Sequence, residues 1–126
     1  MVTSLGNDVM TTWDNLLSGK SGANQISHFD ASKFKTQFAC EVKDLDVSDL
    51  FEPKEVRRYD RNIHYTIHSA QQAIQDAGIC INQHDSYRCG VIYGCGMGGV
   101  HTMDTNIANF GAGDGTPRYS PFFIPM

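Results

Sequence analysis

The feature that most constrains the fold is an apolar run that leads directly into a glycine-dense turn. The run, Arg88–Tyr93, is apolar at nearly every position, and glycines follow at positions 94, 96, 98 and 99. Such a run is typical of a strand that is covered on both faces, as in an α/β protein. Glycines in the turn leave room for another backbone or a ligand to approach closely. We therefore expect a buried strand followed by a tight, closely packed turn.

Two segments carry the signals of amphipathic helices. The first begins at Val9, after Asn7 and Asp8, either of which is a good N-cap, and Gly19 is suited to end it. The clearer helix is Asp60–Gly78. Its apolar residues recur at spacings of three and four, so this stripe is expected to face a core. The stripe comprises Ile63, Ile67, Ala70, Ile74 and Ala77.

Shorter elements fill the remaining chain. Gln37–Val42 alternates enough to predict a short strand, and Val100–Phe110 is compatible with a helix after the glycine turn. Asp46–Phe51 predicts one helical turn, and Pro53 suits the first turn of the next helix. Helices alternating with short strands are typical of a single α/β domain, the natural count for 126 residues.

Charge and hydropathy exclude several classes of protein. The chain has 14 acidic and 10 basic residues, a formal charge of −4, and nucleic-acid binding needs a basic footprint instead. No apolar run approaches the ~18 residues of a membrane span. No basic segment leads into an apolar one at the N-terminus, so no secretory signal is expected. We expect a cytoplasmic protein that binds neither nucleic acid nor membrane.

Four cysteines and a pair of histidines invite chemical interpretations. The cysteines contain no Cys-x-x-Cys pair, and two lie in apolar, strand-like sequence, so buried reduced thiols are expected. Cys95 in the glycine turn has no adjacent base that would make it a nucleophile. His64 and His68 have the i, i+4 spacing of metal ligands, but no third ligand recurs at a matching position. Exposed or hydrogen-bonded histidines are therefore the preferred interpretation.

The glycine turn is also a literal GxGxxG. A dinucleotide site needs this motif early in a βαβ unit, with an acidic residue about 20 positions later. Asp114 has that spacing but lies in a glycine-rich loop, not at the end of a second strand. Nucleotide binding therefore remains an alternative that the spacing alone does not favour.

Six segments in order resemble the type II β-ketoacyl-[acyl-carrier-protein] synthases. The glycine turn resembles the GVxxGSGxGG turn of that family, with Cys95 at the usual serine, and Asp60–Gly78 resembles its long helix. The remaining segments are Val2–Asp8, LLSGKSG (16–22), His28-Phe29-Asp30 and SPFFIP (120–125). The resemblance covers nearly the whole chain.

The resemblance implies an α/β fold of the thiolase-like kind, with a mixed sheet and covering helices. It implies that residues 1–126 form an incomplete N-terminal fragment of a synthase domain, roughly its first third, in which the first strand and the catalytic region are missing. The full-length parent would be a homodimeric acyltransferase that needs no metal or organic cofactor. It would form an acyl-cysteine intermediate and condense it with decarboxylating malonyl carrier protein. The fragment alone is expected to be inactive.

The resemblance also assigns roles to five residues. Met97 matches a pocket residue that gates acyl length, and Phe123 matches one that contributes to the partner's acyl pocket. Lys54, Arg57 and Arg58 match basic residues that dock the acyl carrier protein. The simpler alternatives are core packing for Met97 and Phe123 and a solvated helix face for the basic residues.

Two other functions remain open at this point. One is a ketosynthase of a polyketide-type pathway, which shares these motifs. The other is a stand-alone, non-catalytic module that binds a carrier protein or a nucleotide.

Overall fold

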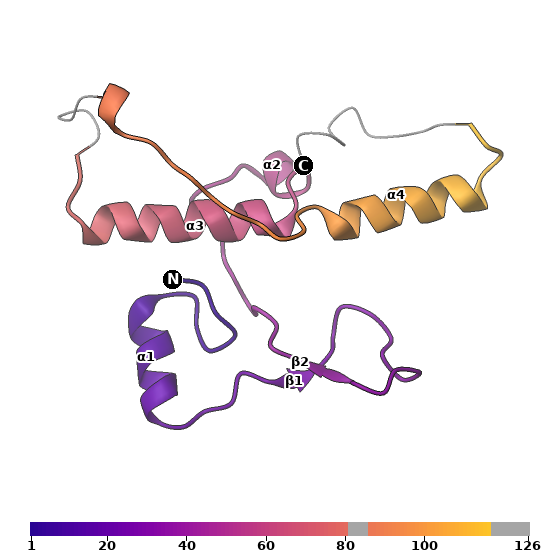
Figure 1. Ribbon diagram of the computed structural model, residues 1–126, viewed down its shortest axis with the longest axis horizontal. Helices are drawn as coiled ribbons and strands as arrows, with labels where there is room; N and C mark the ends of the chain where they lie inside the picture. The colour runs from indigo at the N-terminus through magenta and orange to yellow at the C-terminus, as the bar shows by residue number, and fades with distance from the viewer. Residues whose placement is uncertain (81–85, 117–126) are drawn as a thin grey trace.

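The computed structural model describes residues 1–80 and 86–116. Figure 1 shows a lower part that follows the N-terminus, drawn in indigo and purple, and an upper part in which the longer helices lie end to end. The elements in chain order are α1 (Val9–Leu17), β1 (Asn24–Gln25), β2 (Phe38–Ala39), α2 (Pro53–Val56), α3 (Arg61–Asp76), the 3₁₀ helix η2 (Ser86–Arg88) and α4 (Val100–Ala112).

Helix α1 forms where its end signals predict it. Asp8 is the N-cap, and its carboxylate accepts a hydrogen bond from the Thr11 backbone N–H at 2.7 Å. The helix ends at Leu17, and Gly19 follows with a φ of 67°, a left-handed conformation that glycine adopts without strain. Both expectations for this segment are confirmed.

Strands β1 and β2 form a short antiparallel ladder. Asn24 lies opposite Ala39 and Gln25 opposite Phe38. The strand expected over Gln37–Val42 is therefore confirmed only at Phe38–Ala39. The ladder is the only sheet among residues 1–80 and 86–116, and the wider mixed sheet is not formed by these residues.

Helix α2 is a single turn held by its own capping residues. Pro53 occupies the first helical position, as predicted, and the Glu52 and Glu55 side chains form a capping box. The preceding turn is closed by the Phe51 N–H, which donates to the Val47 carbonyl at 3.0 Å. This turn confirms the expected turn over Asp46–Phe51.

Helix α3 is the longest element and has the predicted ends. Asp60 is its N-cap, and Gly78 follows its end with a φ of 62°. Its apolar stripe is half-buried at best, since the Ile67 side chain remains 41% exposed. The buried residue of the helix is His64, which the stripe does not contain. The expectation that the stripe faces a core is not met by the described residues.

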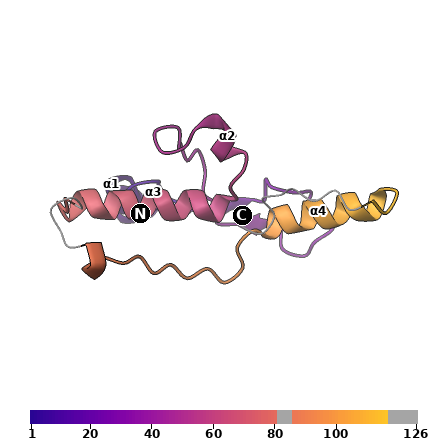
Figure 2. The same cartoon turned by 90° about the horizontal axis from the view of Figure 1, so that it is seen from above.

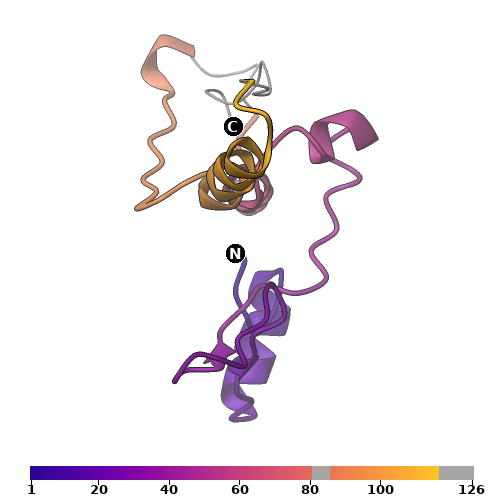
Figure 3. The ribbon, with the colours of Figure 1, turned by 90° about the vertical axis from the view of Figure 1, so that its right-hand side faces the viewer.

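The expected strand Arg88–Tyr93 does not form. Arg88 ends η2, and the residues that follow are irregular, with Val91 79% and Ile92 101% exposed. A strand needs neighbouring strands to pair its backbone groups, and the described residues offer this segment none. Figures 2 and 3 show it running alongside α3, on the side opposite to α2.

The chain buries little of its apolar surface. Among residues 1–80 and 86–116 the buried apolar residues are Ala31, Val47 and Phe51, and the accessible surface is 10082 Å². A compact monomer of 14.0 kDa would expose about 6,700 Å². The four cysteines are free, as expected, but exposed, so the expectation that they are buried is wrong. None of the described helices has the length and apolar character needed to cross a membrane.

Candidate functional site

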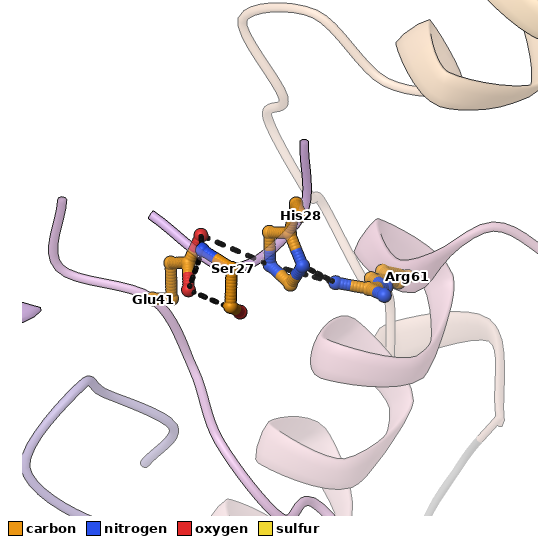
Figure 4. Close-up of polar contacts among 4 residues, drawn as sticks. All are labelled: Ser27, His28, Glu41 and Arg61. Atoms are coloured by element: carbon orange, nitrogen blue, oxygen red, sulfur yellow. Dashed lines mark hydrogen bonds and ion pairs between the residues drawn. The ribbon is translucent and has the colours of Figure 1, made fainter. Parts of the chain in front are cut away.

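A polar network joins the β1–β2 ladder to the start of α3 (Figure 4). The Ser27 hydroxyl donates to Glu41 Oε2 at 2.7 Å, and the Ser27 backbone N–H donates to Oε1 at 3.1 Å. His28 Nε2 lies 3.7 Å from Glu41 Oε1. On the other side of the ring, Arg61 Nη1 lies 2.7 Å from His28 Nε2. The network therefore connects a carboxylate on the exit of β2 with a guanidinium on α3.

Electrostatics favour an ionised carboxylate in this network. Glu41 is buried, and the hydrogen bond from the Ser27 hydroxyl holds its pKa below the usual range, although desolvation acts in the opposite direction. The nearby His28 ring adds a smaller lowering effect. Glu41 thus acts as a fixed negative charge that orients Ser27 and His28.

A hollow of about 320 Å³ opens on the α3 side of this network. It brings the start of α3 together with the glycine turn and the start of α4. Its lining residues are His28, Asp60, Arg61, Asn62, Tyr65, Met97, Gly99, Val100 and His101. Met97, the predicted pocket residue, is therefore a wall residue of a real hollow, with its side chain 78% exposed.

The close approach expected at the glycine turn occurs only at the end of the turn. A Cβ added at Gly98 would lie 2.8 Å from the Asn62 amide nitrogen, so the turn does approach α3 closely there. Gly99 has a φ of 71° and is the N-cap of α4, a conformation that favours glycine. Gly94 and Gly96 face open space, so the close approach expected there is not made by the described chain.

The predicted docking residues gather on and just after α2. Lys54 and Arg57 are exposed, and the Arg57 Nε–H donates to the Pro53 carbonyl at 3.2 Å. The Arg58 guanidinium carbon lies 5.6 Å from the centre of the Tyr59 ring. None of the three lines the hollow that contains Met97. Phe123, the other predicted pocket residue, lies outside the described residues.

The two histidines of α3 have different surroundings. His68 Nε2 lies 3.2 Å from the Asn7 carbonyl and 2.8 Å from the Gln72 amide nitrogen, as expected for a hydrogen-bonded histidine. His64 is buried, with its ring centre 4.9 Å from that of Phe51. The expectation that His64 is exposed or hydrogen-bonded is therefore wrong.

Sequence reasoning missed the role of Glu41 and the partner of Arg61. The available signal for Glu41 was a lone carboxylate within the apolar stretch Phe38–Val42, which is costly unless it is paired. For Arg61 no signal existed, because its contact with His28 spans 33 residues of chain. Distant pairs of this kind become visible only when the elements are placed.

Comparisons with known proteins cover nearly the whole chain. The family described as "Beta-ketoacyl synthase, N-terminal domain" matches residues 1–124. The 3-oxoacyl-[acyl-carrier-protein] synthase 2 of Staphylococcus aureus is 40% identical over 126 residues, which cover 99% of this chain and 31% of that protein. The protein of the same name from Coxiella burnetii (strain RSA 493 / Nine Mile phase I) is 41% identical over 125 residues, 99% of this chain and 30% of its own length.

A solved structure gives the same result at the level of the backbone. "The ishigamide ketosynthase/chain length factor" matches with a TM-score of 0.76 and 25% identity, over 97% of this chain and 30% of that one. The chain therefore spans about a third of the length of the curated relatives and of the solved structure that it matches.

Proposed function

Because the chain belongs to the β-ketoacyl synthase N-terminal domain family, we propose that it supplies the N-terminal third of a 3-oxoacyl-[acyl-carrier-protein] synthase. The observation that carries this proposal is the match over residues 1–124, together with 40% identity to synthases of that name. The likeness to a ketosynthase structure also confirms the predicted thiolase-like α/β fold class. In the proposed reaction an acyl group on an enzyme cysteine condenses with malonyl carrier protein. Carbon dioxide leaves, and the free thiol and a β-ketoacyl carrier protein are the products.

The described residues support two parts of this reaction, neither of them bond-making. Lys54, Arg57 and Arg58 form a docking surface for an acidic carrier protein, and Met97 forms a wall of the acyl pocket. Glu52 and Glu55 lie in the same helical turn and form its capping box, so their carboxylates offset part of the positive charge of this docking surface. Phe123 is proposed to reach the acyl pocket of a partner subunit, in a cytoplasmic homodimer.

Fatty-acid elongation is favoured over the alternatives. The curated relatives at 40–41% identity are 3-oxoacyl-[acyl-carrier-protein] synthases, which gives no support to a polyketide-type pathway. A nucleotide-binding module would need an acidic residue at the end of a second strand, and Asp114, which has the right spacing, follows helix α4 instead. A stand-alone carrier-binding module would share the docking surface but would have no reason to match the pocket turn.

Carrier-protein binding tests the docking surface directly. Reversing Lys54 and Arg57 to glutamate should weaken binding of acyl carrier protein by about five- to thirtyfold at low salt and reduce the salt dependence, because exposed charges act mainly on encounter. The matched control reverses Lys33 and Lys35, which are exposed in the loop between β1 and β2. Equal affinities and salt slopes in all three proteins would show that the basic residues are only a solvated face.

A condensation assay tests whether this chain alone can form the carbon–carbon bond. The chain incubated with acyl and malonyl carrier protein should give no β-ketoacyl product, because the four cysteines are free and exposed and, among residues 1–80 and 86–116, none forms a hydrogen bond with a base that would activate it. Cys95→Ala is the control. Product that disappears in Cys95→Ala would identify Cys95 as a nucleophile and would overturn the prediction that the chain alone is inactive.

In an active enzyme that contains this segment, Met97→Phe should shorten the longest acyl chain that is accepted. An unchanged chain-length profile would exclude a gating role for Met97.

A further inference from the structure

Three aromatic rings and a guanidinium form a continuous run from α3 to the end of α2. The His64 ring meets Phe51 at 4.9 Å between centres and 65° between planes, and Phe51 meets Tyr59 at 6.0 Å and 60°. The Arg58 guanidinium carbon lies 5.6 Å from the Tyr59 ring centre. His64 and Phe51 are 9% and 7% exposed, so the run is anchored at its α3 end. We call these four side chains the ring relay.

The ring relay connects the docking surface to α3. Phe51 precedes α2 by two residues, and Arg58 and Tyr59 follow it, so residues of the relay flank this short helix in the chain on both sides. Figures 2 and 3 show α2 standing away from α3, with the chain that follows α2 leading to the start of α3. A single helical turn has little stability of its own. Its position therefore depends on the contact that Phe51 makes with His64.

The contact suits a neutral imidazole. Nε2 of His64 is buried, and no residue in 1–80 or 86–116 forms a hydrogen bond with it. Protonation would add a charge at a buried nitrogen that has no hydrogen-bond acceptor among the described residues, which is costly. Two groups on the first turn of α3 act on the ring, Asp60 favouring protonation and Arg61 opposing it. Across the adjoining hollow of about 580 Å³ lie His28, Glu41, Lys43, Asp44 and Tyr65.

We infer that His64 is a positioning residue for carrier-protein docking, which holds Arg58 in place through the ring relay and releases it when the imidazole is protonated. This inference rests on the proposed docking function of α2. Burial lowers the pKa of His64 from its ordinary value of 6.5. The packed state is therefore undisturbed above pH 6.5 and loses stability as the pH falls below 6.5, because the released ring binds the proton more readily. The loss is up to about tenfold in the packed-to-released ratio for each unit of depression.

The first test uses the chain without any carrier protein. A nuclear magnetic resonance titration of the histidine ring protons should show His64 titrating below pH 6.5. Cross-relaxation between the His64 and Phe51 rings should be lost over the same range, and the Arg58 side-chain signals should move with it. A His64 that titrates at or above 6.5, or a His64–Phe51 contact that persists after protonation, would overturn the inference, whatever the chain binds.

The second test adds acyl carrier protein at pH 7.5 and 5.5. The wild-type affinity should fall several-fold more on acidification than that of His64→Phe, which keeps an aromatic ring on Phe51 but cannot titrate. His101→Phe makes the same change on exposed α4 and should follow the wild type. The same carrier protein is used throughout, so its own titration cancels. Equal pH dependence of binding in wild type and His64→Phe would overturn the positioning role of His64. If the His64–Phe51 contact titrates as expected but the chain does not bind carrier protein at pH 7.5, the proposed docking function is overturned instead.

Discussion

Buried apolar side chains occur in residues 1–80 but not among the described residues 86–116, although in the first region Trp13, Leu16 and Leu17 of α1 also remain at least 54% exposed. In the first region Val47 and Phe51 are buried, and polar networks connect α3 to the N-terminal loop and to the ladder. In the second region Val91, Ile92 and Met97 are each at least 78% exposed. Helix α4 also carries an exposed apolar stripe, which comprises Val100, Met103, Ile107 and Phe110.

The difference shows which parts of this sequence can form their hydrogen bonds with residues that are close in the chain. In the first region, turns, helix caps and nearby polar side chains supply these hydrogen-bond partners. The apolar run of the second region has the composition of a buried strand, but it has no strand to pair with among the described residues. Apolar surface left open in this way favours association. Each prediction below tests one side of this contrast, from the largest expected effect to the smallest.

The core contact of the first region should give the largest effect. Phe51→Ala should lower the free energy of unfolding by about 3 kcal/mol, because it removes a buried ring that contacts His64 and Tyr59. Ile92→Ala should change it by less than about 0.5 kcal/mol, since that side chain is fully exposed. Urea unfolding followed by circular dichroism measures both, with Phe51→Leu as a milder variant should Phe51→Ala not fold. Equal losses at the two positions would mean that the second region is packed as well as the first.

The open surface of the second region should drive self-association. Replacing Val91 and Ile92 by lysine should weaken association by at least about tenfold, because each apolar side chain that is covered contributes roughly 1.5–3 kcal/mol. Sedimentation velocity over a range of concentrations measures this. Ser32→Lys together with Thr36→Lys is the control for added charge, at exposed positions of the first region. A wild-type chain that sediments as a single monomer and unfolds cooperatively would contradict the prediction.

The Glu41 network should make the first region sensitive to acid. The pKa of Glu41 is lowered from its ordinary value of 4.5 by the hydrogen bond from Ser27. The carboxylate therefore stabilises the fold above pH 4.5, and this stabilisation is lost as the pH falls through the lower, folded-state pKa. Glu41→Gln should be less stable than the wild type near pH 7, and the difference in urea midpoint should shrink as the pH falls below 4.5. The control is Asp104→Asn, at an exposed position of α4, for which the difference in stability from the wild type should not change with pH. A difference in stability between Glu41→Gln and the wild type that is independent of pH would exclude an electrostatic role for Glu41.

Removal of the N-cap of α1 should have the smallest effect of these changes. Asp8 accepts hydrogen bonds from both the backbone and the hydroxyl of Thr11, whereas α4 begins at Gly99 with no side-chain cap. Asp8→Ala should raise the amide exchange rate of the first turn of α1 a few-fold, because that turn loses its acceptor. Asp8→Asn, which keeps an acceptor, should change it less. Exchange that is unaffected by Asp8→Ala would mean that tertiary contacts, not the cap, hold this turn.

The helices and their ends were determined by the sequence alone. Asp8, one of the two caps expected for α1, caps that helix, and α3 begins after Asp60, where the sequence places its start. Gly19 and Gly78 follow the ends of the two helices, as their positions predicted. Each of these signals acts within one or two turns of chain, because helical hydrogen bonds join residues four apart. The family was equally accessible, because its segments occur in order along the chain.

Only the tertiary structure decided the conformation of residues 89–93, the burial of His64 and the partners of Glu41. An apolar run becomes a strand only when other strands supply its hydrogen bonds, and no property of the run itself can supply them. His64 is buried because Phe51, thirteen positions away, folds against it, and Arg61 meets His28 across 33 positions. Contacts of this kind depend on how separate elements are brought together in space, which local periodicity and capping residues do not specify.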